Sequence, residues 1–452
     1  MEVLVPLEEL YLQNLLHESL YFANPVTIFL RRFSICVLLN YIPQNFEVEN
    51  FVNPVRVFDF NNKPSQKGKI VYLCEREIRI KDNFSLQFAL QKSKELNLPL
   101  KIIHPKINYE HLPKEKFIIR QLIQVQQNFA AFNLDFEIIN KTPPVIIKTI
   151  NPALLIIDFN PILNRAWLKN VDFKVIEIDG HNIVPARYVS DKQEYSAATI
   201  RAKIYHNISP FLSEFNNLTT EKVEADYVLE DFIKSKLANY AKFKNNPSKN
   251  ILSGLSKYLN LGFISSQRVA LDVIKSRASA ENKEAFLEEL IVRKELADNF
   301  CLYNKRFKSL KGIPSWAKNS LECHKEDFKP YIYTMEEIES ATTHDNLWNA
   351  TQNQLKREGI IHGYLRMYWA KKILEWTNSA DVALKIAIYL NDKYAYDAPS
   401  ANGYVGILWA IAGLHDRAFT DYPVTGKIRR MAYDSLKRKY DLGDYLNKYV
   451  SK

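Results

Sequence analysis

The stretch Ile70-Val-Tyr-Leu73 is the first of several short apolar runs between residues 70 and 178. The later runs are Leu100-Lys-Ile-Ile103, Phe136-Glu-Ile-Ile139, Leu154-Leu-Ile-Ile157 and Val175-Ile-Glu-Ile178. Runs of this length that are rich in Ile and Val are typical of buried strands. Between the second and third runs, apolar residues recur on one helical face at Ile118, Leu122, Val125 and Phe129. Strands that alternate with helices predict a parallel sheet covered by helices.

The second half of the chain has a different character. Beyond about Asn216 the strand-like runs largely stop, and long helical patterns are separated by glycine and proline. We therefore predict an α/β fold with a parallel-sheet, Rossmann-like domain at residues 53–205, a linker at 206–230 and an all-α domain at 231–452. Residues 1–52 are an extension of unknown role. No GxGxxG follows the first run, so the usual dinucleotide fingerprint is missing.

Composition narrows the class of protein. The chain has 452 residues, enough for two domains, and a formal net charge of +10. The basic surplus favours a polyanionic partner, although solubility alone would also explain it. The four cysteines lie far apart without a CxxC pair, which predicts no metal site and an intracellular protein. The apolar run Val26 to Ile42 contains Arg31 and Arg32, so it is too short and too charged to span a membrane.

The stretch from Gly363 to Trp376 carries a cation in an apolar stripe. On a helix, one face would hold His362, Arg366, Trp369, Ile373 and Trp376. Aromatic residues at this spacing are usually core residues. An arginine beside them must find an anion, because an unpaired buried charge costs several kcal/mol. Asp397 is a suitable partner.

Three polar segments could carry chemistry. The first, Ser253 to Lys257, combines small residues with a lysine before a predicted helix; it suits a phosphate, but serine as a plain N-cap is the alternative. In the second, Glu289 lies at the edge of an apolar stripe and could face a pocket or simply solvent. The third, Thr425 to Tyr440, is predicted to form a basic helix that either contacts DNA phosphates or is merely solvated.

Together these segments resemble the class II cyclobutane pyrimidine dimer photolyases of the photolyase and cryptochrome superfamily. The resemblance extends from about Asn53 to the C-terminus. It rests on the segments Glu75-Arg-Glu-Ile-Arg79 with Asp82-Asn83, Asp179-Gly-His-Asn-Ile-Val-Pro185, Ser190-Asp-Lys-Gln-Glu-Tyr195, Glu289-Leu-Ile-Val-Arg-Lys-Glu-Leu-Ala-Asp-Asn-Phe300, Thr343-His-Asp-Asn-Leu-Trp-Asn-Ala350, His362 to Trp376 and Gly426-Lys-Ile-Arg429.

The resemblance implies a lyase that repairs DNA. It implies that the all-α domain binds flavin adenine dinucleotide (FAD), active as reduced FADH⁻, and that blue light drives electron transfer to a pyrimidine dimer flipped out of double-stranded DNA. A single chain would act as a monomer. Some relatives also bind an antenna chromophore in the α/β domain, and no residue here decides whether this chain does.

The resemblance also implies residue roles. The residues implied to bind FAD are Tyr240, Leu252, Ser253, Gly254, Leu255, Ser256, Arg366, Asp397 and, near flavin N5, Asn391. Glu289 is implied to hydrogen-bond the flipped bases and to stabilise charge that develops on them. Those implied to contact the dimer or the DNA are Met367, Trp409, Lys244, Lys427 and Arg429. The tryptophans implied to reduce the flavin in light are Trp348, Trp369 and Trp376, in an order that spacing does not give.

Some positions depart from the family pattern. Gly254 and Lys257 replace Asn and Pro, and Lys244 replaces an arginine, which could alter flavin affinity. Ala398-Pro-Ser-Ala401 replaces the usual G-R-D-P, so the contacts of that turn differ. Two other functions are consistent with parts of the pattern: a cryptochrome-like blue-light sensor without repair activity, and a DNA-binding protein without flavin, which would be colourless.

Overall fold

The computed structural model describes residues 52–215 and 221–450. All of them belong to one compact unit that spans residues 44–452. The interpretations of residues 1–51, including the run Val26 to Ile42, lie outside the described residues.

A six-stranded sheet forms the first part of the fold, in the strand order β1-β6-β5-β2-β3-β4. The strands are β1 (Val57–Asp59), β2 (Ile70–Leu73), β3 (Leu100–Pro105), β4 (Phe136–Ile139), β5 (Leu154–Asp158) and β6 (Lys174–Ile178). The predicted strands are β2 to β6, which pair in parallel, so the predicted fold class is confirmed. Strand β1 is antiparallel to β6 and was not predicted, because three residues that end in Asp59 carry no apolar run.

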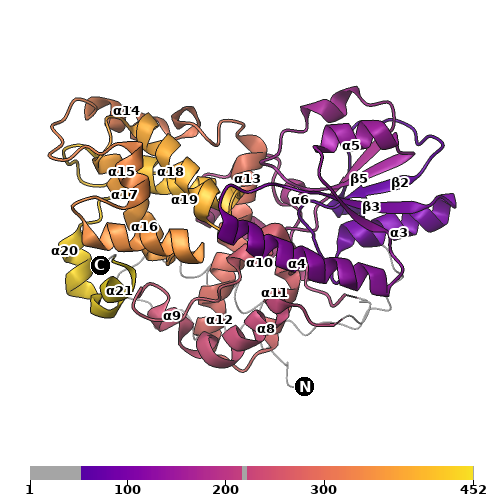
Figure 1. The fold of residues 1–452 in the computed structure, drawn as a ribbon, viewed down its shortest axis with the longest axis horizontal. Helices are drawn as coiled ribbons and strands as arrows, with labels where there is room; N and C mark the ends of the chain where they lie inside the picture. The colour runs from indigo at the N-terminus through magenta and orange to yellow at the C-terminus, as the bar shows by residue number, and fades with distance from the viewer. Residues whose placement is uncertain (1–51, 216–220, 451–452) are drawn as a thin grey trace, which may run out of the picture. The chain divides into compact units, whose positions relative to one another are not determined.

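Helices cover both faces of this sheet. Figure 1 shows α5 (Pro143–Ile150) on one side and α3 (Phe84–Leu96) and α4 (Leu112–Ala131) on the other. Ile146 and Ile147 of α5 pack on Val71, Ile103 and Leu155 in one apolar cluster. The predicted helical face of α4 is buried as expected. Two short helices, α6 (Ala186–Val189) and α7 (Ala197–Asn207), follow β6.

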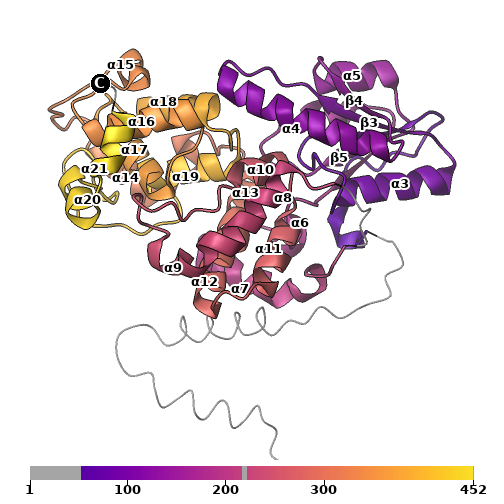
Figure 2. The same cartoon turned by 60° about the horizontal axis from the view of Figure 1, so that its bottom comes forward.

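From residue 224 onward, the described chain contains helices and a single isolated β-bridge between Tyr422 and Gly426. The elements are α8 (Glu224–Asp231), η4 (Phe232–Lys236), η5 (Leu237–Asn239), α9 (Tyr240–Phe243), α10 (Ser256–Leu261), α11 (Ser266–Lys275), α12 (Ala280–Leu287), η6 (Glu288–Arg293), α13 (Lys294–Tyr303), η7 (Leu310–Gly312), α14 (Ser315–Cys323), α15 (Met335–Ser340), α16 (Asn346–Glu358), α17 (Gly363–Glu375), α18 (Ala380–Tyr394), α19 (Ala401–Ala412), α20 (Tyr433–Lys439) and α21 (Gly443–Tyr449). Figures 1 and 2 both show α16, α17, α18 and α19 grouped together. Their shared core contains Trp348, Trp369 and Tyr404.

The predicted basic helix from Thr425 to Tyr440 is wrong in its first half. Helix α20 begins only at Tyr433, and Lys427 and Arg429 lie in a loop. Gly426 has a φ of +53°, which an α-helix does not allow, and the backbone N–H of Phe419 donates to the carbonyl of Lys427. The chain therefore folds back on itself before α20.

Buried charges join the sheet to the helices. The Asp158 carboxylate at the end of β5 accepts backbone N–H groups of Glu75, Arg76 and Glu77 at 2.8, 2.7 and 3.0 Å. Arg76 then reaches across to Asp298 of α13, with Nη2 2.9 Å from Oδ1. Both side chains of this ion pair are almost completely buried. Breaking it would leave a desolvated charge without a partner.

We expect Asp298→Ala to lower the free energy of unfolding by about 3–5 kcal/mol, because Arg76 would remain buried and unpaired. Chemical denaturation would measure this change. The matched control is Asp172→Ala, which removes the partner of Lys63 in an exposed pair 3.7 Å long. That substitution should change the free energy by less than about 1 kcal/mol. Equal effects of the two substitutions would contradict a structural role for the buried pair.

Candidate functional site

The arginine in the apolar stripe of α17 has the predicted partner. Arg366 Nη1 and Nη2 lie 3.3 and 3.2 Å from Asp397 Oδ1, and Nη2 lies 3.3 Å from Oδ2. Asp397 follows the C-terminal end of α18. Both side chains are mostly buried, at 24% and 13% exposure, so solvent screens this pair less than a surface pair. The ion pair joins α17 to the turn between α18 and α19.

Asn391 lies on the last turns of α18 and is buried. Its Nδ2 donates to Asp392 Oδ1 at 3.2 Å. Gly403 of α19 lies directly against it, because a Cβ at Gly403 would come within 3.0 Å of Asn391 Nδ2. The absence of a side chain at Gly403 thus allows the asparagine to occupy this position.

Two glycines on these helices have free space at the position of a side chain. A Cβ at the half-buried Gly406 of α19, or at the exposed Gly363 at the start of α17, would meet no neighbouring atom within 4 Å. His362, the N-cap of α17, accepts the N–H of Tyr364 at Nδ1, while its buried Nε2 has no hydrogen-bond partner. Burial lowers the pKa of His362 to about 4, so the ring is neutral near pH 7. These features suit the uptake of a polar ligand.

The segment Leu252 to Leu255 forms a loop before α10, and Ser256 is the first residue of that helix. Gly254 has a φ of +71°, and the nearest atom to a Cβ there would be Val228 Cγ1 at 3.9 Å. Ser253 Oγ accepts the N–H of Leu255 at 3.3 Å, and Leu255 is the N-cap of α10 without a side-chain cap. The alternative that a serine caps this helix is therefore wrong. A glycine-containing loop with accessible backbone can bind an anion.

Glu289 lies on η6 and its side chain is half exposed. Lys244, just after α9, places its Nζ 3.0 Å from Glu289 Oε1, a pairing that sequence spacing did not reveal. Tyr240 on α9 is buried against Phe286 and Phe232, at ring distances of 5.4 and 5.7 Å. Burial, and to a lesser extent the charge of Glu289, raises the pKa of Tyr240. The candidate carboxylate is accessible and neighbours a cation.

The tryptophans form a continuous chain with Trp348 in the middle. Its ring stacks on Trp369 at a centroid distance of 6.4 Å and an interplanar angle of 4°. Its other neighbour is Trp376, at 5.6 Å and 69°. All three rings are buried, and Trp348 Nε1 donates to the carbonyl of Trp369 at 3.0 Å. In space the three rings therefore follow one another in the order Trp369, Trp348, Trp376.

Further aromatic rings extend this chain to the surface. Tyr333 meets Trp376 edge to face at 5.6 Å, and its hydroxyl lies 2.6 Å from His344 Nδ1. His344 stacks on Tyr331 at 3.7 Å, and Tyr331 is exposed. Neither tyrosine could be singled out from the sequence, because nothing distinguishes them among the 25 tyrosines of the chain before the fold brings Tyr333 to Trp376 and Tyr331 to His344.

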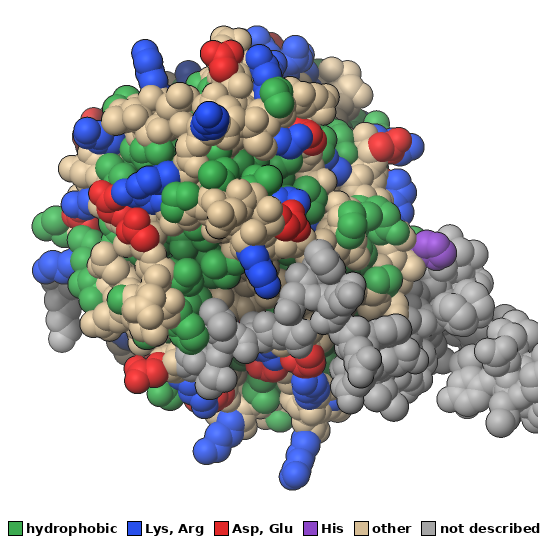
Figure 3. All heavy atoms as spheres, turned by 90° about the vertical axis from the view of Figure 1, so that its right-hand side faces the viewer, with side chains coloured by type: hydrophobic (Ala, Val, Ile, Leu, Met, Phe, Trp, Pro, Cys, Tyr) green, Lys and Arg blue, Asp and Glu red, His purple; other side chains and the backbone are tan. Residues whose placement is uncertain are grey.

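The other residues that the resemblance implies to contact the dimer or the DNA lie on two helices and one loop. Met367 on α17 and Trp409 on α19 are half-buried, and Trp409 Nε1 donates to Asp416 Oδ2 at 3.1 Å. Lys427 and Arg429 are exposed in the loop before α20. On the α/β end of the molecule, Figure 3 shows basic, acidic and apolar side chains of the described residues interspersed with one another.

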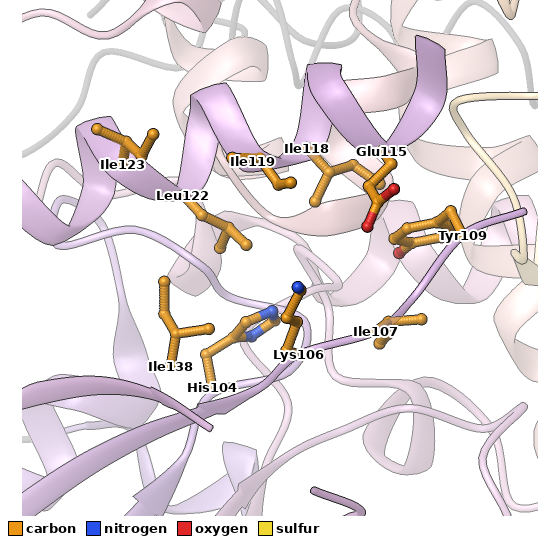
Figure 4. Close-up of a pocket in the computed structure, with 10 residues that line it drawn as sticks. All are labelled: His104, Lys106, Ile107, Tyr109, Glu115, Ile118, Ile119, Leu122, Ile123 and Ile138. Carbon is orange, nitrogen blue, oxygen red and sulfur yellow. The ribbon is translucent and has the colours of Figure 1, made fainter. Parts of the chain in front are cut away.

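A separate cavity of about 190 Å³ lies between α4 and the ends of β3 and β4. Figure 4 shows its apolar wall of isoleucines and Leu122, with His104, Lys106, Glu115 and Tyr109 adding polar groups. His104 Nδ1 lies 2.8 Å from the carbonyl of Cys74. The cavity belongs to the α/β part of the chain and is distinct from the ion pair on α17.

Within residues 52–215 and 221–450, no group of three or more His, Cys, Asp or Glu side chains is arranged to hold a metal ion. No helix in the same part of the chain is long and apolar enough to cross a membrane.

Comparison with known proteins gives consistent relatives, although no family model matches the chain. It is 36% identical over 433 residues to the deoxyribodipyrimidine photo-lyase of Potorous tridactylus, covering 85% of this chain and 81% of the relative. The enzyme of the same name from Arabidopsis thaliana is 35% identical over 438 residues, covering 84% and 88%. That of Methanothermobacter thermautotrophicus is 31% identical over 445 residues, covering 88% and 98%.

Solved structures show the same fold. A class III photolyase from Agrobacterium tumefaciens superposes with a TM-score of 0.65 at 15% identity, covering 86% of this chain and 87% of that chain. A cryptochrome from Synechocystis superposes with a TM-score of 0.65 at 13% identity, covering 86% and 89%.

Proposed function

The chain belongs to the deoxyribodipyrimidine photo-lyases, and from this premise we propose that it is a class II enzyme that binds FAD and splits cyclobutane pyrimidine dimers in DNA. A buried aromatic chain, the Arg366–Asp397 ion pair and Asn391 converge on one group of helices, and this convergence supports the proposal. When bound and reduced, FAD would absorb light and supply the electron that opens the dimer.

The residues present fit this cofactor. Arg366 and Asp397 offer a paired cation and anion, and the buried Nε2 of His362 has no hydrogen-bond partner. The residues that would hold the phosphates are Tyr240, Leu252, Ser253, Gly254, Leu255 and Ser256. Asn391, kept in place by Gly403, would orient the reactive edge of the flavin.

The aromatic chain would reduce the flavin in light. Trp369 lies three residues after Arg366 on α17, so it is the tryptophan nearest the flavin in our proposal. Electrons would then pass inward from Trp376 through Trp348 to Trp369, with Tyr333 and Tyr331 leading to the surface.

Other side chains would receive the DNA. Glu289 would hydrogen-bond the flipped bases, while Met367 and Trp409 would pack against the dimer. Lys244, Lys427 and Arg429 would contact phosphates, which makes DNA affinity depend on salt. We propose that the protein acts as a monomer within the cell, wherever its DNA lies.

A blue-light sensor without repair activity is the second candidate. It would keep the flavin and the tryptophans and would need no contacts to a dimer. The likeness to a cryptochrome is one of fold at 13% identity, whereas the relatives at 31–36% identity are named photo-lyases. Retention of Glu289, Met367 and Trp409 supports repair.

We include no antenna chromophore in the proposal. The cavity beneath α4 measures about 190 Å³. Sites for drug-sized ligands usually measure roughly 300–1,000 Å³. A chromophore with several fused rings would need the isoleucine side chains of this cavity to move.

The decisive experiment is to irradiate the reduced, flavin-loaded protein with blue light in the presence of DNA that contains thymine dimers. We expect intact thymines to be restored, as measured by chromatography of digested DNA, and no restoration in the dark. Flavin binding without any repair would favour the light sensor. A colourless protein would exclude both functions.

We expect Glu289→Ala to lower the repair yield by roughly tenfold or more, because a group that stabilises developing charge is removed. Flavin absorbance should remain, since the half-exposed Glu289 would face the bases rather than the flavin. The control is Glu336→Ala on α15, a glutamate that is also exposed. Loss of flavin from the Glu289 variant would show that the assigned role is wrong.

Trp369→Phe is predicted to block photoreduction of oxidised flavin and to spare repair by chemically reduced protein. Transient absorption spectroscopy would follow the photoreduction, and the repair assay would follow the second activity. Trp167→Phe is the matched control, because Trp167 packs against the sheet far from the aromatic chain in the sequence. If the Trp369 variant photoreduces its flavin at the wild-type rate, Trp369 is not part of the electron path.

A further inference from the structure

His324, just after α14, lies between two carboxylates of different segments. Its Nδ1 is 2.6 Å from Asp327 Oδ2, and its Nε2 is 2.7 Å from Asp421 Oδ1. Asp421 belongs to the loop that carries Lys427 and Arg429. The imidazole therefore fastens this basic loop to the end of α14.

The geometry demands a protonated ring. A neutral imidazole has one N–H and one lone pair, so it can donate to only one of the two carboxylates. With both ring nitrogens facing carboxylate oxygens, only the imidazolium avoids contact between a lone pair and an anion. Asp327 and Asp421 accordingly raise the pKa of His324. Lys329 lies near Asp327, Glu326 lies near Lys329, and Lys325, next to His324 in the chain, pairs with Glu322.

The same loop is held at several further points. Asp327 Oδ2 accepts the N–H of Val424 at 2.7 Å, and Val424 has a φ of +70°, an unfavourable conformation for a β-branched residue. Ser320 Oγ of α14 accepts the N–H of Lys427 at 2.8 Å. A Cβ at Gly426 would come within 2.2 Å of Ser320 Oγ and 2.8 Å of His324 Cδ2. A turn so strained persists only where its surroundings hold it in place.

We infer that His324 is a positioning residue for DNA binding: its imidazolium holds Asp421 and Asp327, and so fixes the loop that presents Lys427 and Arg429 to DNA phosphates. This inference rests on the proposed function. Loss of the proton leaves one carboxylate without its N–H donor and adds a net negative charge beside the basic loop. Both effects weaken attraction to the phosphates.

The protonation of His324 determines the direction in which DNA affinity changes with pH. The pKa of His324 is raised above its ordinary value of 6.5. The imidazolium therefore binds both Asp327 and Asp421 at pH 6, and one of these interactions is lost as the pH rises through the raised pKa. DNA affinity should therefore fall across that interval. Most DNA-binding groups, the lysines and arginines, do not titrate there.

The test measures the Kd for a duplex that contains one thymine dimer, in the dark and at constant ionic strength, between pH 6 and pH 9. The Kd of flavin-loaded wild-type protein should rise by about fivefold as His324 loses its proton. A change of this size is at the upper end of the range for a partly exposed ion pair. His324→Gln should bind weakly at every pH. His206→Gln, which alters an exposed histidine on α7, should behave as wild type. A pH dependence that survives in His324→Gln would overturn the inference.

A second variant tests the inference independently, should His324→Gln fail to fold. Asp421→Asn keeps the imidazole but removes one carboxylate, so the pKa of His324 falls and the midpoint of the affinity curve should move to lower pH. An unmoved midpoint would also overturn the inference. Binding in the dark and repair in light are separate readouts. Intact pH-dependent binding without repair would count against the proposed function, and repair with pH-independent binding would count against the role of His324.

Discussion

The carboxylate of Asp158 is the point on which the rest of the structure depends. It ends β5 and accepts three backbone N–H groups from residues 75–77, which fixes the turn that follows β2. Arg76 leaves that turn and pairs with Asp298 on α13. Asp158, Arg76 and Asp298 are all buried. A small displacement that separated any of these charges from its partner would leave it desolvated and unpaired, at a large cost in free energy. Helix α13 continues directly from η6, which carries Glu289, so the position of the proposed catalytic carboxylate depends on the sheet.

The strands could be predicted because parallel strands buried on both faces must be apolar almost throughout, as Ile70 to Leu73 are. The partner of Arg366 could be predicted because a cation in an apolar stripe requires an anion. Strand β1 could not be predicted, because it pairs with β6 and this contact joins residues 57–59 to residues 176–178, far apart in the sequence. The pair of Lys244 with Glu289 and the contact of Tyr333 with Trp376 also join distant segments. Local pattern does not encode such contacts.

The failed prediction of a basic helix has its cause in tertiary contacts. Basic residues at helical spacing were present, but Gly426 adopts a positive φ and the backbone of Phe419 pairs with Lys427. A turn stabilised by α14 thus prevailed over helical propensity. The outcome also suits the proposed function, because a loop anchored at His324 and Ser320 presents Lys427 and Arg429 on a fixed backbone.

The tryptophan chain crosses between two helices twice. Trp369 belongs to α17 and Trp376 is the C-cap of that helix, whereas Trp348, which separates them, belongs to α16 and donates its indole N–H to the backbone of α17. Electron tunnelling weakens steeply with distance, so conduction along this path requires the two helices to keep their spacing. The rate of light-driven reduction would then report the spacing between α16 and α17. It would fall if the two helices moved apart, even where the overall fold stays intact.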